Sequence, residues 1–411
     1  MTTRTETGGR GPEVRSDVGF DLSLSEEQRL VQKTARDFAR EKVLPKAADI
    51  DENKKIPMEL IKEMGTLGFM GIDVPEEYGG SGLDRLTYML VVEEINRACA
   101  STGVVLCTHV SLAIEPLLLF GTDAQKKRWL PAMATGEKLG CFALSEPASG
   151  SDAAAMRTSA RLEGGAYVLN GTKNFITNGS IADIAIVFAQ TQGQGPLSAS
   201  DSERGAKKHK GIAAFVVEKG TPGFTVGKLE RKLGIRGSDT AQLNFQDCRV
   251  PAANLLGSVG DGFKIALSTL DGGRISIAAQ AVGIARACHE DALAYAKERE
   301  AFGKKLTDFQ AIQWKLADMA TEIDAARLLT WKAATLKDQG ATHRLEAAEA
   351  KLFASDVAVK AGRDCVQIFG GYGYLADYPA ERHYRDAKIT EIYEGTSEIM
   401  KLVIADEILS E

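Results

Sequence analysis

The hydrophobic pattern of this chain changes its period twice, and the order of those changes limits the folds that it can adopt. From about Leu22, apolar residues recur every three or four positions, as they do on the buried face of a helix. After about Gly140 the apolar runs shorten, and Thr240–Phe245 alternates apolar with polar residues, which is typical of a half-buried strand. Beyond Pro251 long helical patterns return. The order of helices, strands and helices argues against a fold of alternating βαβ units.

This pattern divides the 411 residues into four expected parts. They are a disordered tail at residues 1–20, an N-terminal helical domain at 21–140, a middle β-domain at 141–250 and a C-terminal helical bundle at 251–411. Ser23, with Glu26 three positions later, resembles the capping box that opens a helix. Residues 192–210 are rich in Gly and Ser, and we expect them to form a solvated loop. Three long amphipathic patterns predict helices of the bundle: Ile275–Arg299, Asp308–Lys337 and Leu345–Gln367.

Charge and composition exclude several classes of protein. The 50 Lys and Arg residues against 56 Asp and Glu give a net charge of −6, which argues against nucleic-acid binding. A small polyanionic ligand stays possible, because only its local site has to be positive. No apolar run approaches the roughly 18 residues of a membrane-spanning helix. The 6 cysteines form no C-x-x-C pair and the 5 histidines no H-E-x-x-H pattern, so we expect reduced, buried thiols and no metal site.

The common nucleotide-binding signatures are missing from the sequence. No G-x-G-x-x-G follows a predicted strand, and no G-x-x-x-x-G-K-[ST] occurs, so neither a Rossmann site nor a P-loop is supported. A nucleotide bound to this chain must therefore be held in another way.

Three segments carry residues suited to chemistry. Gly140–Asp152 ends a strand-like run in a hydroxyl-rich turn, which exposes backbone N–H groups to a ligand. Asn174–Gly179 offers an aromatic face and a hydroxyl group, and in Arg385–Glu398 the carboxylate of Glu394 precedes a Gly-Thr-Ser run. Each segment alone is typical of an ordinary loop or strand end. Glu394 alone is more often an exposed carboxylate than a base whose pKa is raised by apolar neighbours.

Taken together, these segments resemble the acyl-CoA dehydrogenase family, most closely its short-chain, butyryl-CoA branch. The resemblance runs from about Asp21 to the C-terminus, with the matching segments in the family's order and spacing. Seven separated stretches carry it: Cys141–Asp152, Asn170–Asn178, Leu229–Arg236 with Gly237 and Ser238, Gly262–Arg274, Arg299–Lys304, Gln367–Gly373 and Ile392–Ile399. Agreement at so many separate places makes the match specific.

The resemblance implies a fold of three parts: an N-terminal helical domain, a middle β-barrel-like domain and a C-terminal four-helix bundle. It also implies FAD as the cofactor, a homotetramer, and an electron-transfer flavoprotein as the partner that takes up the electrons. Enzymes of this kind lie in the bacterial cytoplasm or in the mitochondrial matrix of eukaryotes. No membrane, metal or nucleic acid is implied.

The family's binding positions map onto this sequence residue by residue. Those implied to line the flavin are Phe142, Leu144, Ser145, Ser151, Phe175, Ile176, Thr177, Thr396 and Glu398. Those implied to hold the pyrophosphate and adenine of a neighbouring subunit's FAD are Arg299, Phe302, Gln310, Gln367, Ile368, Gly370 and Gly371. Those implied to contact the acyl-CoA are Ser151, Asp271, Gly272, Gly273, Arg274 and Gly395.

Glu394 matches the family's catalytic base. The resemblance implies that it removes the α-proton of an acyl thioester, while its backbone N–H and a ribityl hydroxyl of the flavin stabilise the enolate oxygen. Some family members carry the base next to the position of Arg274, where this chain has Gly273, so Glu394 is the sole candidate. The chain departs from the family in three further places: Phe175 stands where Trp is frequent, Pro147–Gly150 contains fewer glycines than usual, and the insertion at Gln192–Lys210 is longer than usual.

The implied reaction is the α,β-dehydrogenation of a short-chain acyl-CoA to a trans-2-enoyl-CoA. Three alternatives stay open. The substrate could be a branched, dicarboxylic or aromatic acyl-CoA, the enzyme could be an oxygen-using acyl-CoA oxidase, or the chain could be a flavin-free scaffold homologue. The sequence leaves the acyl preference undecided, because it does not place the residues at the floor of the acyl pocket.

Overall fold

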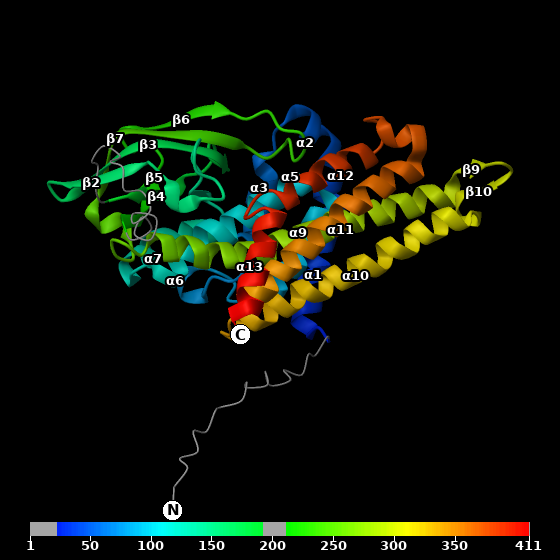
Figure 1. Ribbon diagram of the computed structural model, residues 1–411, viewed down its shortest axis with the longest axis horizontal. Helices are drawn as coiled ribbons and strands as arrows, with labels where there is room; N and C mark the ends of the chain where they lie inside the picture. The colour runs from blue at the N-terminus through cyan, green and yellow to red at the C-terminus, as the bar shows by residue number, and fades with distance from the viewer. Residues whose placement is uncertain (1–22, 192–210, 411) are drawn as a thin grey trace, which may run out of the picture.

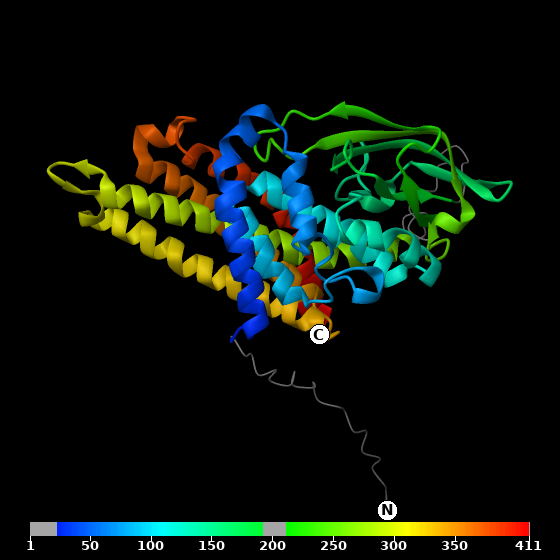
Figure 2. The ribbon, with the colours of Figure 1, turned by 180° about the vertical axis from the view of Figure 1, so that it is seen from behind.

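The N-terminal helices form the middle of the molecule, between a sheet and a set of long C-terminal helices (Figures 1 and 2). The computed structural model describes residues 23–191 and 211–410, so the tail expected at 1–20 and the loop expected at 192–210 lie outside the described residues. Helix α4 is almost wholly buried, because it packs against α1 on one side and against the C-terminal α9 on another. The helices are α1 (Glu26–Phe38), α2 (Ala47–Asn53), α3 (Met58–Thr66), α4 (Arg85–Ala98), α5 (Ala100–Cys107), the π-helical η5 (Thr108–Ile114), α6 (Glu115–Phe120) and α7 (Asp123–Ala134).

The first helix begins two residues later than the sequence predicted. Ser25 caps α1: its Oγ accepts from the Gln28 N–H at 3.1 Å, and the Gln28 side chain accepts from the Ser25 N–H at 2.9 Å. The capping box predicted for Ser23 and Glu26 is therefore wrong. Gln serves at the third helical position as well as Glu does, and Glu26 instead lies in the first turn, where its charge favours the helix dipole.

The middle of the chain forms an eight-stranded, mostly antiparallel sheet in the order β6-β7-β3-β2-β4-β5-β8, with β1 paired in parallel to β4 (Figure 1). Both faces of β4 are buried. Ile186 and Phe188 pack in a cluster with helical side chains, whereas Ala185 and Val187 pack against other strands. The strands are β1 (Gly140–Ala143), β2 (Ser159–Glu163), β3 (Ala166–Thr177), β4 (Ile184–Gln190), β5 (Ile212–Glu218), β6 (Phe224–Leu229), β7 (Thr240–Pro251) and β8 (Leu255–Leu256).

Long helices complete the chain, and the 37-residue α9 is at their centre. It packs against α4, α10 and α11, and its small residues allow close approach: a Cβ at Gly283 would lie 2.6 Å from the Glu93 carbonyl oxygen of α4. The elements are α9 (Gly262–Glu298), the hairpin strands β9 (Glu300–Ala301) and β10 (Lys304–Lys305), α10 (Gln310–Asp338), α11 (Arg344–Phe369), α12 (Ala380–Ala387) and α13 (Ser397–Ser410). The predicted fold class of helices, sheet and helical bundle is confirmed.

One apolar stretch contradicts the expectation that no run could span a membrane. Ala100–Phe120, which comprises α5, η5 and α6, has the length and the mean hydropathy, 1.8, of a membrane-spanning helix. Of its most apolar window, 83% is buried inside the fold, because α5 and η5 pack against α4, α9 and β1. The stretch is a core helix.

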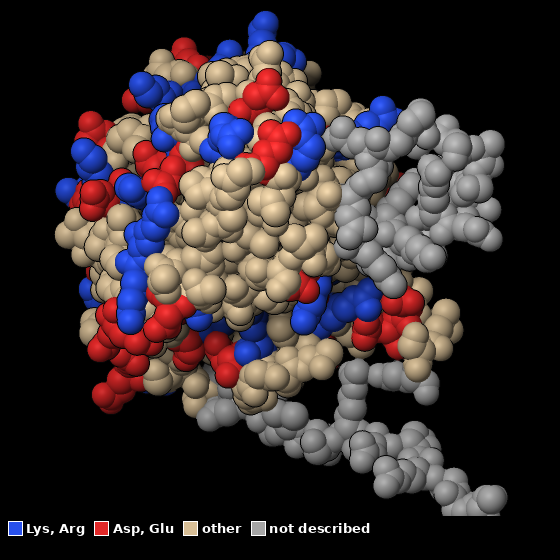
Figure 3. All heavy atoms as spheres, turned by 90° about the vertical axis from the view of Figure 1, so that its left-hand side faces the viewer, with Lys and Arg blue, Asp and Glu red and all other residues tan. Residues whose placement is uncertain are grey.

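The state of the cysteines and the mixture of surface charges agree with what the composition predicts. All six cysteines are buried and free, as expected. On the sheet end of the molecule, basic and acidic side chains are interspersed around a broad uncharged area (Figure 3).

Candidate active site

A bulge near the end of β3 forms the first part of the site. The register between β3 and β7 slips between Lys173 and Ile176, and Phe175 within this bulge has a φ of +62°. Such a conformation is strained for a bulky residue, and the bulge re-aims its side chain. Phe175 is 64% exposed, Ile176 is buried in the sheet core and Thr177 is half-buried. An exposed aromatic ring held by a strand in this way is a stacking surface for a flat ligand.

A buried ion pair joins this bulge to the turn after β1. Lys173 Nζ donates to Glu146 Oε1 at 2.8 Å and to the Leu144 carbonyl at 3.0 Å. Glu146 also accepts from two backbone N–H groups further along the turn, at 2.6 and 3.0 Å. The Asn174 N–H donates to the Ser145 carbonyl at 2.9 Å. The first two predicted segments therefore lie side by side, held by two charged residues that sequence reasoning did not single out.

The predicted flavin-lining residues of the β1 turn differ in what they expose. Phe142 and Leu144 are only 9% and 8% exposed, and the Phe142 ring meets Phe188 edge-on with centroids 4.9 Å apart. Ser145 is half-buried and Ser151 is exposed. A ligand at this turn would therefore meet backbone groups and the two serines more than the two apolar side chains.

Glu394 lies in the turn that leads into α13. It adopts the left-handed conformation with a φ of +53°, and Gly395 follows with a φ of +102°. The Glu394 side chain is half-buried, and its Oε2 atom is buried without a hydrogen-bond partner in the described part of the chain. A Cβ at Gly273 would overlap this Oε2 atom and lie 2.9 Å from a methyl carbon of Leu112. Glycine at 273 thus leaves room for the carboxylate, and the structure brings these predicted residues together.

Two cations lie beside the Glu394 carboxylate. Lys351 of α11 is buried and donates from Nζ to the Gly395 carbonyl at 2.6 Å, and Arg274 of α9 is 5% exposed and donates to Asp271 at 2.5 Å. Both cations favour the charged carboxylate, yet burial outweighs them and raises the pKa of Glu394 to about 8. Burial also lowers the pKa of Lys351 to about 8. A carboxyl group whose pKa lies near neutrality is suited to proton abstraction.

A cluster of buried charges lies next to this base, and sequence reasoning missed it. Glu115 at the start of α6 forms ion pairs with Lys337 of α10 and, at 3.0 Å, with Arg85 of α4. A Cβ at Gly272 would lie 2.5 Å from a Glu115 carboxylate oxygen. Gly272 adjoins the glycine that faces Glu394, and Glu115 is close enough to raise the pKa of Glu394.

The buried helical stretch of α5 and η5 connects the two halves of the site. Asn178, just beyond β3, donates from Nδ2 to the Val105 carbonyl of α5 at 3.3 Å. About two helical turns later, Leu112 of η5 packs against Gly273. The bulge that carries Phe175 and the helix face opposite the base are therefore attached to one rigid element.

The residues predicted to hold pyrophosphate and adenine gather at the other end of the bundle. Arg299 is exposed, with Cζ 5.5 Å from the centre of the Tyr372 ring, and with Gly370 and Gly371 it lines a hollow of about 360 Å³, here called the distal hollow. Beyond the adjoining residues, no atom of the described chain lies within 4 Å of the place of a Cβ at either glycine, so their backbone is open to a ligand. Phe302, in the β9–β10 hairpin, is 96% exposed. Because this hairpin and the sheet lie at opposite ends of the molecule (Figure 1), one ligand that touches both must bridge two copies of the chain.

The remaining predicted residues lie near these two places. Gln310 and Gln367 are exposed and Ile368 is buried. Thr396 caps α13, because its Oγ1 accepts from the backbone N–H three residues later at 3.3 Å, and Glu398 is exposed. Their contacts with a flavin stay predictions. Within the described residues, no group of three or more His, Cys, Asp or Glu side chains could hold a metal ion.

Three family models match the chain in succession: the N-terminal, middle and C-terminal domains of acyl-CoA dehydrogenases, at residues 25–137, 141–248 and 260–409. The chain belongs to the acyl-CoA dehydrogenase family. Human mitochondrial short-chain specific acyl-CoA dehydrogenase is 52% identical over 388 residues, which cover 94% of this chain and 91% of the relative. As a member of this family, the protein is an oxidoreductase with FAD as its cofactor, as the sequence predicted.

Two solved structures extend the comparison. Butyryl-CoA dehydrogenase from Megasphaera elsdenii matches with a TM-score of 0.90 at 48% identity, over 95% of this chain and 100% of that one. A structure described as the electron transferring flavoprotein of Acidaminococcus fermentans, in work on flavin-based electron bifurcation, matches with a TM-score of 0.91 at 48% identity, with the same coverage.

The pH profile of this acyl-CoA dehydrogenase is expected to have its acid limb near pH 8. If Glu394 is the base, it takes up a proton only when it is ionised, and its pKa is about 8, so kcat/KM for flavin reduction is expected to rise with pH through that value and to level off above it. Glu115 raises the pKa of Glu394, so the Glu115→Gln variant moves the limb to lower pH. Lys351 and Arg274, the cations beside the base, stay in place in this variant. Stopped-flow measurement of flavin reduction at several pH values checks the displacement.

The matched control is Glu59→Gln, which removes an exposed carboxylate from α3 and should leave the limb in place. If the acid limb of the pH profile is unchanged in Glu115→Gln, or moves to higher pH, Glu115 does not raise the pKa of Glu394.

Proposed function

We propose that this protein oxidises a short-chain acyl-CoA at its α,β-bond to the trans-2-enoyl-CoA and passes the electrons to an electron-transfer flavoprotein. The observation that carries the proposal is the Glu394 carboxylate, held against Gly273 with a pKa of about 8. Similarity to the short-chain and butyryl-CoA enzymes supports the length of the acyl group. Similarity to the structure from the work on electron bifurcation supports the electron acceptor.

The residues present fit the family's cofactor. The exposed ring of Phe175 offers a stacking face at one end of the molecule. At the other end, the distal hollow offers the guanidinium of Arg299 and the open backbone of Gly370 and Gly371, which suit a pyrophosphate because charge-assisted hydrogen bonds to phosphate are strong. When bound, FAD supplies the acceptor for the β-hydrogen, which leaves the substrate as a hydride.

The chain's own residues handle the α-proton. Glu394 accepts it, and the bond from Lys351 to the Gly395 carbonyl holds the turn that aims this carboxylate at Gly273. We assign the backbone N–H of Glu394 as a donor to the enolate oxygen. An acyl chain beside Leu112 displaces water from the carboxylate, which raises its pKa further and strengthens its basicity.

An anaerobic panel of acyl-CoA substrates tests this function. Butyryl-CoA is expected to bleach the bound flavin with the highest kcat/KM. Faster reaction of a branched, dicarboxylic, aromatic or long-chain acyl-CoA overturns the short-chain assignment and identifies the alternative. Purified protein without flavin overturns the enzymatic proposal itself. Reduced enzyme should survive in air and yield its electrons to an electron-transfer flavoprotein, whereas prompt reaction with oxygen would identify an oxidase.

The proposal includes a homotetramer and a location in the bacterial cytoplasm or the mitochondrial matrix. The distal hollow supports assembly, because its residues lie far from the sheet of their own chain (Figure 1). The human relative, mitochondrial by name, supports the location in a eukaryotic cell.

A further inference from the structure

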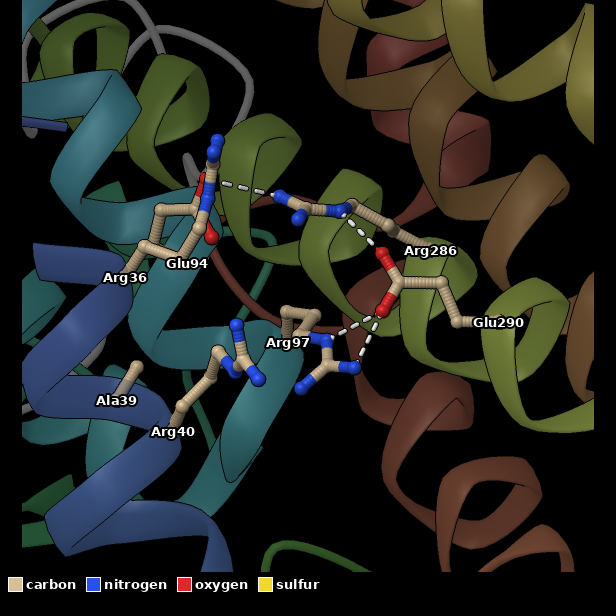
Figure 4. Close-up of a pocket in the computed structure, with 7 residues that line it drawn as sticks. All are labelled: Arg36, Ala39, Arg40, Glu94, Arg97, Arg286 and Glu290. Atoms are coloured by element: carbon tan, nitrogen blue, oxygen red, sulfur yellow. Dashed lines mark hydrogen bonds and ion pairs between the residues drawn. The ribbon is translucent and has the colours of Figure 1, made fainter. Parts of the chain in front are cut away.

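A second hollow lies away from the proposed active site, where α1 and the π-helical η1 (Ala39–Val43) that continues it meet α4 and α9 (Figure 4). Its volume is about 420 Å³. Four guanidinium groups and two carboxylates line it, so its local charge is positive although the whole chain carries −6. The charged lining residues are Arg36, Arg40, Arg97, Arg286, Glu94 and Glu290.

The two carboxylates are already shared between three of the arginines. Glu94 Oε1 lies 2.7 Å from Arg36 Nη2 and 3.0 Å from Arg286 Nη1. Glu290 accepts from the Nε atoms of Arg286 and Arg97, both at 2.7 Å. Each acid therefore serves two guanidinium groups, and donors outnumber acceptors around the hollow.

Arg40 is the exception. It is exposed, and no hydrogen bond or ion pair joins it to the other residues of the hollow in Figure 4. Arg40 also donates no hydrogen bond to Glu94 Oε2, a buried oxygen that has no donor in the described part of the chain. Instead, the guanidinium groups of Arg40 and Arg97 face one another across the hollow in Figure 4. Glu290 binds Arg97 through Nε and Nη2. An anion between Arg40 and Arg97 would be attracted by the Arg40 guanidinium and by the Nη1 edge of Arg97.

We propose that this hollow binds a small polyanion with at least two oxyanion groups, a phosphate ester or a polycarboxylate, through Arg40 and Arg97. Guanidinium groups match carboxylate and phosphate oxygens with paired N–H donors. A single phosphate ion would leave much of the 420 Å³ unfilled, which favours a larger ligand. The site does not depend on the proposed function. Because a ligand held by Arg40 and Arg97 joins η1 to α4, occupation stabilises the folded protein.

Pyrophosphate and citrate are the probes, with KCl at matched ionic strength to control for screening. At tenfold excess over Kd, either probe is expected to raise the Tm of the FAD-loaded protein by about 2 °C, and isothermal titration gives Kd directly. Arg40→Gln is expected to weaken binding at least about tenfold, the loss of one charge-assisted hydrogen bond. The matched control, Arg29→Gln, removes the same charge from an exposed residue of α1 outside the hollow and should bind as the wild type does.

Three outcomes overturn the proposal. One is a Tm that rises no further in pyrophosphate or citrate than in KCl. Another is equal weakening in Arg40→Gln and Arg29→Gln, which would show general attraction to a basic surface. The third is unchanged binding in Arg97→Lys, which keeps the charge but loses the planar fork and serves as the second variant if Arg40→Gln misfolds.

Discussion

Replacing Glu394 with glutamine is expected to leave FAD and acyl-CoA bound but to slow reduction of the flavin by about 10²- to 10⁴-fold, the usual contribution of a general base. Glutamine keeps the shape and hydrogen-bonding capacity of the side chain, so the turn before α13 should persist. Glu115, whose charge raises the pKa of Glu394, cannot take over. Glu115 is engaged by Lys337 and Arg85, and it lies against Gly272 on the neighbouring position of α9.

Anaerobic stopped-flow spectroscopy separates loss of the base from loss of the cofactor. In Glu394→Gln, butyryl-CoA should fail to bleach the flavin, whereas dithionite should still reduce it. Glu59→Gln, the exposed control on α3, should react as the wild type does. If Glu394→Gln keeps more than about a tenth of the wild-type rate, the loss falls short of a general base and another residue removes the proton.

The order of helical and β-sheet regions along the chain was predictable, because the hydrophobic period of a segment shows which side of a helix or strand is buried. Thr240–Phe245 alternates in sequence and lies within β7, and the long pattern from Ile275 lies within α9. Finer features depend on backbone geometry that periodicity does not report. The sequence prediction placed the cap of α1 at Ser23, whereas Ser25 and Gln28, which have the same three-residue spacing as Ser23 and Glu26, form the capping box. Ala100–Phe120 passes the length and hydropathy test for a membrane-spanning helix, which we did not expect from the sequence, and its burial depends in part on α9 and β1, which come later in the chain.

The candidate site was predictable where residues sit in a local motif, and missed where partners are far apart. Glu394 stands in such a motif, and the resemblance to the family singled it out as the candidate base, a role that stays a prediction. The ion pairs of Glu115 join residues 30 and 222 positions away, in Arg85 and Lys337. The one sequence signal that could have pointed to this cluster is Glu115 itself, a single acidic residue inside the apolar stretch of α5, η5 and α6. Lys173 gave a similar signal as a single cation inside the pattern of β3.

Replacing Arg299 with alanine is expected to release most of the FAD and to loosen the assembly at the same time. Arg299 is exposed beside Gly370 and Gly371, at the end of the bundle opposite the sheet (Figure 1). A hydrogen bond from a guanidinium to a phosphate contributes about 1.5–3 kcal/mol, so its loss weakens FAD binding by roughly 10- to 100-fold. If the distal hollow serves the FAD of a neighbouring copy, every bound FAD also joins two subunits.

That linkage makes the two losses inseparable, because a ligand that binds only the assembled state stabilises the assembly, and the assembly strengthens its binding in return. The ratio of absorbance at 450 nm to that at 280 nm reports the FAD content, and gel filtration with light scattering reports the mass. Arg29→Ala, on α1 and outside the distal hollow, should keep both. In Arg299→Ala, added FAD should restore the larger species in proportion to the FAD bound. A stable monomer that holds a full complement of FAD would show that one chain suffices, and would place Arg299 outside the cofactor site.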